Sequence, residues 1–172
     1  MINFSQNNYK AEFQKIEIPK IGLIALSTDF TIEQDFRNLL YKKPVNLYVN
    51  RIPFKNPMNQ MNYLNMKDKL SSIAENILPG ESVNTIAYGC TSGTIAIGEK
   101  VVEKQISEAK KNCYVTTPIT AALKAFKKLS LKNIAVLTPY PELVNKTIFE
   151  YLEKKNINVT SFNSFNIESD RD

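Results

Sequence analysis

Short apolar runs rich in β-branched and aromatic residues recur along the chain, and each is typical of a β strand. These predicted strands are Ile21–Leu26, Val45–Phe54, Thr85–Gly89, Cys113–Thr117, Ile134–Leu137 and Val159–Phe165. The first of them, IGLIAL, is apolar without interruption, which indicates a strand covered on both faces.

Longer segments between these runs carry apolar residues at helical spacing. Helices are predicted over residues 31–40, 58–78, 93–109, 118–129 and 141–154, with Thr31 and Gln34 forming a capping box and Pro118 in a first turn. Alternating strands and helices predict βαβ units, hence an α/β, Rossmann-like fold with a mainly parallel sheet. Ligands of such sheets bind beyond the carboxyl ends of the strands. The loops expected to hold a site are 27–31, 51–58, 89–93, 117–119 and 138–142.

The 172 residues are 43% hydrophobic and 23% charged, which is a globular composition. The chain has two cysteines and no histidine. This excludes Ser-His-Asp and Cys-His catalysis and a structural zinc site, and it disfavours a disulfide scaffold. A general acid or base must therefore be Cys, Asp, Glu, Lys or Tyr.

The formal net charge is +5, and the lysines are scattered along the predicted helices. A solvated lysine-rich surface explains this charge better than attraction of anionic ligands. The chain lacks the basic stripe with interleaved aromatics expected of a nucleic-acid binder, and it has no apolar run long enough for a membrane span. Its first twenty residues lack the apolar centre of a secretory signal, so a cytoplasmic location is predicted.

The loop from Gly89 to Gly93 is the strongest candidate site, because it follows a predicted strand and opens a helix. Backbone N–H groups and the positive helix end meet there and favour an anion. The same field stabilises a thiolate, and cysteines at helix N-termini can have pKa values of about 3.5–7.5. Cys90 is thus a candidate acid–base group, with Thr91 and Ser92 as carboxylate-binding hydroxyls. The alternative is that Cys90 is a small buried hydrophobe.

Three further side chains leave strands at the same predicted edge. Asp29 could orient a substrate or only cap the next helix. Arg51 could bind a carboxylate through two parallel hydrogen bonds or be an ordinary surface arginine. Tyr140 could donate to a developing enolate oxygen or be a half-buried aromatic. Cys113 begins a strand rather than following one, which favours core packing.

Four separated motifs resemble one known group. They are IGLIALSTDFTIEQDF (21–36), RIPFKNP (51–57), ILPGESVNTIAYGCTSGT (77–94) and IAVLTPY (134–140). In this order they resemble the ectoine-utilisation protein A group, which is related to maleate cis–trans isomerase and arylmalonate decarboxylase in the aspartate/glutamate racemase superfamily. The resemblance covers nearly the whole chain from about residue 20.

This resemblance implies two similar α/β halves that face each other across a cleft, and no metal, pyridoxal phosphate or nucleotide. Racemases and isomerases of the superfamily carry one cysteine in each half, and in maleate isomerases the first cysteine attacks the double bond. The decarboxylase uses a single cysteine in its second half. The expected organisation is an extension at 1–19, a first domain at 20–118 and the start of a second domain at 119–172.

Position by position, Cys90 matches the first cysteine of that group. Thr91 and Ser92 match its carboxylate-binding donors, and Tyr140 matches a tyrosine that hydrogen-bonds the same carboxylate. Asp29 falls where maleate isomerases have a substrate-contacting asparagine. Arg51 belongs to the RIPF-like motif without an assigned role.

The expected function is therefore that of a cofactor-independent isomerase or racemase that acts on a small carboxylate, with ectoine breakdown suggested by the group's name. The second cysteine is absent, and Cys113 does not replace it, so the chain is expected to be the N-terminal portion of a longer protein. The alternatives are a non-catalytic carboxylate-binding protein and a half-protein, oligomeric or poorly folded, without activity of its own. Homo-oligomer formation therefore stays open.

Overall fold

The structure is a computed structural model that describes residues 10, 12 and 17–169. Most of the expected extension at 1–19 lies outside the described residues. The elements, in chain order, are β1 (Lys20–Leu26), α1 (Ile32–Leu39), β2 (Asn46–Ile52), α2 (Gln60–Leu64), the 3₁₀ helix η1 (Lys67–Lys69), α3 (Leu70–Glu75), β3 (Thr85–Tyr88), α4 (Thr91–Ile97), α5 (Glu99–Ala109), β4 (Tyr114–Thr116), α6 (Pro118–Lys128), β5 (Asn133–Thr138), α7 (Glu142–Lys154) and β6 (Asn158–Ser164).

Four strands form a fully parallel sheet in the order β2-β1-β3-β4, which confirms the predicted α/β class. The chain leaves β1 to one side for β2 and then crosses to its other side for β3. This reversal makes the carboxyl ends of β1 and β3 a topological switch point, where a crevice opens between loops that diverge. The loops after β1 and β3 are those that carry Asp29 and Cys90.

Successive residues of β1 and β3 point to opposite faces of this sheet, and helices cover both. Ile24, Ile86 and Tyr88 are fully buried in the larger core, which includes the buried residues of α3 and α5. Leu23, Ala25 and Ala87 form a smaller cluster on the other face, against Ile32 and Phe36 of α1. Burial on both faces explains why these strands read as continuous apolar runs.

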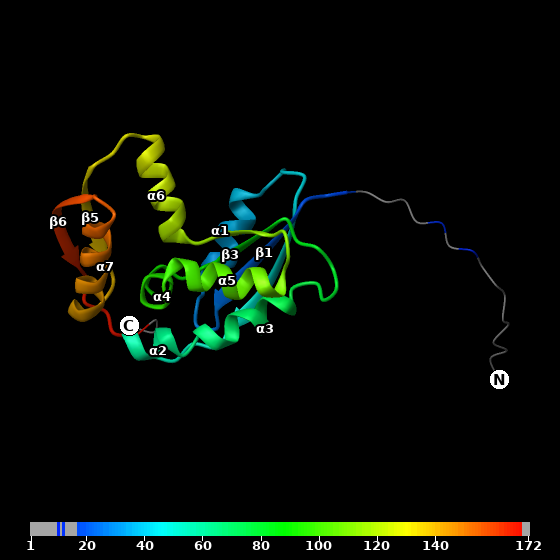
Figure 1. The fold of residues 1–172 in the computed structure, drawn as a ribbon, viewed down its shortest axis with the longest axis horizontal. Helices are drawn as coiled ribbons and strands as arrows, with labels where there is room; N and C mark the ends of the chain where they lie inside the picture. Colours follow the sequence, from blue (N-terminus) through cyan, green and yellow to red (C-terminus); the bar gives the residue numbers. More distant parts are fainter. Residues whose placement is uncertain (1–9, 11, 13–16, 170–172) are drawn as a thin grey trace.

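Strands β5 and β6 form a second, two-stranded parallel sheet and do not join the first. Figure 1 shows this sheet with α7 at one end of the molecule. Val144, Ile148 and Leu152 form the buried stripe of α7. Two paired strands alone are only marginally stable, so this packing must supply much of the stability of the smaller sheet. The domain boundary between residues 118 and 119 stays a prediction.

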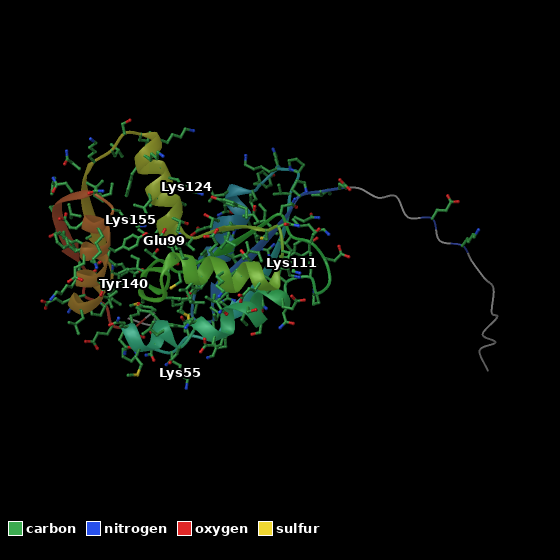
Figure 2. All side chains as sticks on the ribbon, viewed as in Figure 1. Lys55, Glu99, Lys111, Lys124, Tyr140 and Lys155 are labelled. Carbon is green, nitrogen blue, oxygen red and sulfur yellow. The ribbon has the colours of Figure 1, made fainter. Side chains whose placement is uncertain are left out.

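An ion pair links α5 to the end of α7. The Lys155 ammonium lies 2.6 Å from the Glu99 carboxylate, and both side chains are labelled in Figure 2. Burial alone would raise the pKa of Glu99, but the hydrogen bonds from Lys155 and Tyr151 and the charge of Lys155 together outweigh it, so the pKa lies below its ordinary value. Because both side chains are partly exposed, this ion pair contributes little to the free energy of folding. Its main effect is to set the relative position of α5 and the end of α7.

Three local predictions were wrong in detail. The Thr31 side chain caps nothing, and Gln34 instead donates to Asn38, so the capping box does not form. The helix predicted over 58–78 is divided into α2, η1 and α3. The apolar residues of this segment therefore do not share one helix face, and Met61 is exposed. The helix predicted over 93–109 begins two residues earlier and is interrupted at Gly98, whose φ of 98° suits glycine.

Candidate functional site

A cavity of about 340 Å³ lies at the carboxyl ends of β1, β3 and β5. Four of the five predicted loops contribute to it. Its lining residues are Leu26, Asp29, Phe54, Met58, Tyr63, Gly89, Cys90, Thr91, Ser92, Pro139, Tyr140, Ile167 and Ser169. The fifth predicted loop lies elsewhere, since Thr117 lines a different cavity between α5 and α6. The cavity thus lies between the first sheet and the smaller second one.

Cys90 is the N-cap residue of α4, directly beyond β3. Its extended backbone turns the thiol back over the helix end, where Sγ accepts the N–H of Gly93 at 3.2 Å. The side chain is 4% exposed and still lines the cavity. The sulfur is therefore shielded from bulk water, lies at the carboxyl edge of the sheet and can be reached from the cavity.

Hydroxyl groups accompany the thiol on both walls of the cavity. Thr91 and Ser92 form the first turn of α4, and the Ser92 hydroxyl lies 4.0 Å from Cys90 Sγ. Tyr140 follows β5 and reaches the cavity from the smaller sheet. Its own loop is held in place because the Asn145 side chain donates to the Tyr140 carbonyl at 2.6 Å. The structure thus brings these four predicted residues together.

Asp29 also lines the cavity, but one carboxylate oxygen is engaged locally. Its Oδ1 accepts the N–H groups of Thr31 and Ile32 at 2.9 and 2.8 Å, which satisfies free donors at the start of α1. This is the capping function weighed from the sequence, and it replaces the predicted Thr31 cap. A role for Asp29 toward a substrate stays a prediction.

Arg51 does not line the cavity, and its guanidinium is used within the fold. It donates to the carbonyls of Leu26 and Asp29 at 3.1 and 2.8 Å, and it contacts Glu33 at 2.6 Å. Arg51 therefore cross-links the end of β2, the loop after β1 and the first turn of α1. This geometry gives it the task of shaping the loop that carries Asp29, and a grip on a substrate carboxylate stays a prediction.

Replacing Arg51 with methionine is expected to lower the free energy of unfolding by about 1–2 kcal/mol, because three backbone carbonyls at the end of β1 and in the loop after it lose a charged donor. The ion pair itself is partly exposed and adds little. Glu33→Gln keeps an acceptor for Arg51 and serves as the control, with a loss below about 1 kcal/mol. Urea unfolding measures both variants. Equal losses in the two would contradict a role based on the loop carbonyls.

Several residues in or beside the cavity were not predicted from the sequence. Phe54 and Tyr63 stack with ring centroids 5.4 Å apart and form an apolar wall. Tyr88 is fully buried close to Cys90. Its position could have been predicted, because residues two apart along an extended segment point to the same face. Cys113 is half-buried against the core, as expected, and burial raises the pKa of its thiol.

The site combines a thiol, hydroxyl groups and apolar side chains in a half-open cavity, which is an arrangement typical of small-molecule sites. Over residues 10, 12 and 17–169, no group of three or more Cys, Asp or Glu side chains is placed to hold a metal ion. Across that same part of the chain, none of the helices combines the length and apolarity that spanning a bilayer requires.

The comparison that decides the family is a match of the arylmalonate decarboxylase family model to residues 37–171. The chain belongs to this family. Maleate isomerase from Alcaligenes faecalis is 23% identical over 152 residues, which cover 81% of this chain and 60% of that protein.

Solved structures of the same group share the fold of this family member. A structure of Nocardia farcinica maleate cis–trans isomerase with a covalently bound succinylcysteine intermediate has a TM-score of 0.78 at 18% identity, covering 89% of this chain and 66% of that one. A liganded arylmalonate decarboxylase has a TM-score of 0.71 at 19% identity, covering 87% and 63%. The chain thus spans somewhat less than two thirds of the length of these relatives.

Proposed function

We propose that this chain provides the thiol-bearing site of a cofactor-independent isomerase or racemase that acts on a small carboxylate. The observation that carries the proposal is the position of Cys90, which caps α4 at the switch point and shares one cavity with Thr91, Ser92 and Tyr140. The family membership and the maleate isomerase relatives support the same class of chemistry.

In the proposed mechanism, one substrate carboxylate lies between the α4 end, with Thr91 and Ser92, and the Tyr140 hydroxyl. The Cys90 thiolate then removes a proton beside that carboxylate, or adds to a conjugated double bond. Either step places negative charge on the carboxylate oxygens, where fixed donors are most effective; losing one such donor typically costs about 10²–10³ in rate. The covalent succinylcysteine in the Nocardia farcinica relative supports the addition route.

The finer assignments belong to the same proposal. We place the enzyme in the cytoplasm and divide it into a domain at 20–118 and the start of a second domain at 119–172. Ectoine-derived diaminobutyrate compounds join the substrate candidates because of the motif resemblance. The relatives are longer than this chain. A segment equivalent to their additional residues would supply the second acid–base group of the proposed mechanism.

The test is incubation of the chain with maleate, an arylmalonate and a diaminobutyrate derivative in deuterated water, followed by proton NMR. Formation of fumarate, loss of carbon dioxide or deuterium uptake beside the carboxylate is the expected result with at least one substrate. A rise in melting temperature without any reaction would instead favour a carboxylate-binding protein. If the chain shows no rise in melting temperature and no reaction with any of these compounds, the proposal is contradicted. Size-exclusion chromatography would then identify an oligomeric half-protein.

A further inference from the structure

The Tyr88 hydroxyl lies close to the sulfur of Cys90. Tyr88 ends β3 and is fully buried, and its hydroxyl is within hydrogen-bonding range of the Cys90 thiol. A methyl group on Gly93 would come within 2.7 Å of Cys90 Sγ and 2.8 Å of Tyr88 Oη. The absence of a side chain at position 93 therefore leaves the space in which the sulfur and the hydroxyl meet.

A second sulfur competes for the same hydroxyl. Tyr88 Oη donates to the thioether of Met66 at 3.6 Å, and Met66 is itself fully buried. A thioether is a weak acceptor, whereas a thiolate forms a strong charge-assisted hydrogen bond. Burial, and after it the nearby Cys90, raises the pKa of Tyr88 well above its ordinary value, so the phenol keeps its proton across the working pH range.

We propose that Tyr88 is a positioning residue that turns its hydroxyl from Met66 to Cys90 when the thiolate forms, and so stabilises and aims the reactive sulfur. This inference rests on the proposed role of Cys90. It assigns two donors to the thiolate, the Gly93 N–H from α4 and the Tyr88 O–H from β3.

The charges around the sulfur make such donors necessary. Among the described residues that line the cavity, Asp29 from the loop after β1 is the one with a formal charge, and its sign opposes thiolate formation. The other titratable groups that face the cavity are the phenols of Tyr63 from α2 and Tyr140 from the β5–α7 loop. Since the described lining offers no cation, stabilisation of the thiolate falls to neutral hydrogen-bond donors.

The experiment is the pH dependence of alkylation by iodoacetamide in a Cys113→Ser background, where Cys90 is the one remaining thiol. Tyr88→Phe is expected to move the pH midpoint upward by about one to two units, because the thiolate loses a donor. Met66→Leu is expected to move it downward, because the hydroxyl loses its competing acceptor. Tyr151→Phe removes a phenol outside the cavity and is expected to leave the midpoint unchanged.

An unchanged or lowered midpoint in folded Tyr88→Phe would overturn the proposal, with circular dichroism reporting the fold. Should Tyr88→Phe fail to fold, Met66→Leu decides, and an upward or absent shift there is the contrary outcome. Alkylation needs no turnover, so this result is separable from that of the proposed function. Shifted midpoints in a protein without activity would overturn the enzyme proposal and leave the Tyr88–Cys90 pairing intact.

Discussion

Cys90→Ser is expected to lower turnover, measured by NMR on whichever substrate reacts, by at least about 10³-fold, as for removal of a catalytic nucleophile. A serine hydroxyl stays protonated where a thiol ionises, so neither proton removal nor addition proceeds at a useful rate. Cys113→Ser is the matched control, because Cys113 lies against the core and outside the cavity.

The control variant should keep its activity within about twofold, since a Cys-to-Ser change at a half-buried packing position alters no reacting group. A comparable loss in both variants would show that the effect is one of folding rather than of chemistry. Full activity in Cys90→Ser would remove the thiol from the mechanism altogether.

Gly93→Ala is the second change with a large expected effect. The added methyl would lie 2.7 Å from Cys90 Sγ, 2.8 Å from Tyr88 Oη and 3.0 Å from Met66 Cε, all in the packed core. Overpacking of this kind costs about 1–3 kcal/mol, which exceeds the gain of about 0.5–1 kcal/mol from replacing glycine in a helix. A net loss of unfolding free energy is expected, together with loss of rapid Cys90 alkylation because the sulfur is displaced.

Gly98→Ala separates the two consequences. Gly98 has a φ of 98°, so alanine there is strained, but the nearest atom to its methyl is Val101 Cγ2 at 3.9 Å. This variant should lose stability in urea unfolding while keeping the alkylation rate of Cys90. If both glycine variants impair alkylation equally, thiol reactivity depends on general stability rather than on the space beside Gly93.

The sequence allowed prediction of the strands, because burial on both faces leaves runs such as IGLIAL that hardly depend on context. Cys90, Thr91 and Ser92 were placed near the loop after β1 by a general rule, since carboxyl ends of parallel strands share an edge. Tyr140 reaches the same cavity from the second sheet, so this rule does not account for its position. The helix at 58–78 was mispredicted because apolar spacing alone does not reveal where an axis breaks.

Arg51 illustrates what sequence reasoning could not provide, whereas capping by Asp29 was one of the two roles weighed from the sequence. Their partners are backbone groups, the carbonyls of Leu26 and Asp29 for the arginine and the N–H groups of Thr31 and Ile32 for the aspartate. Backbone carbonyls carry no sequence signature, so the sequence could not show that the Arg51 guanidinium is engaged within the fold. The separation of β5 and β6 into their own sheet was equally invisible to local patterns.

The cavity has one wall on the four-stranded sheet and the other on the β5–β6 pair, with Cys90 on the first and Tyr140 on the second. A ligand that contacts both walls stabilises the docking of the smaller sheet against the larger one. Ligand binding is therefore thermodynamically linked to that docking. At a concentration 100 times its dissociation constant, such a molecule adds about 2.7 kcal/mol to the native state if the unfolded chain does not bind it. Ligand binding in the cavity and docking of the β5–β6 sheet onto the rest of the fold are therefore linked equilibria.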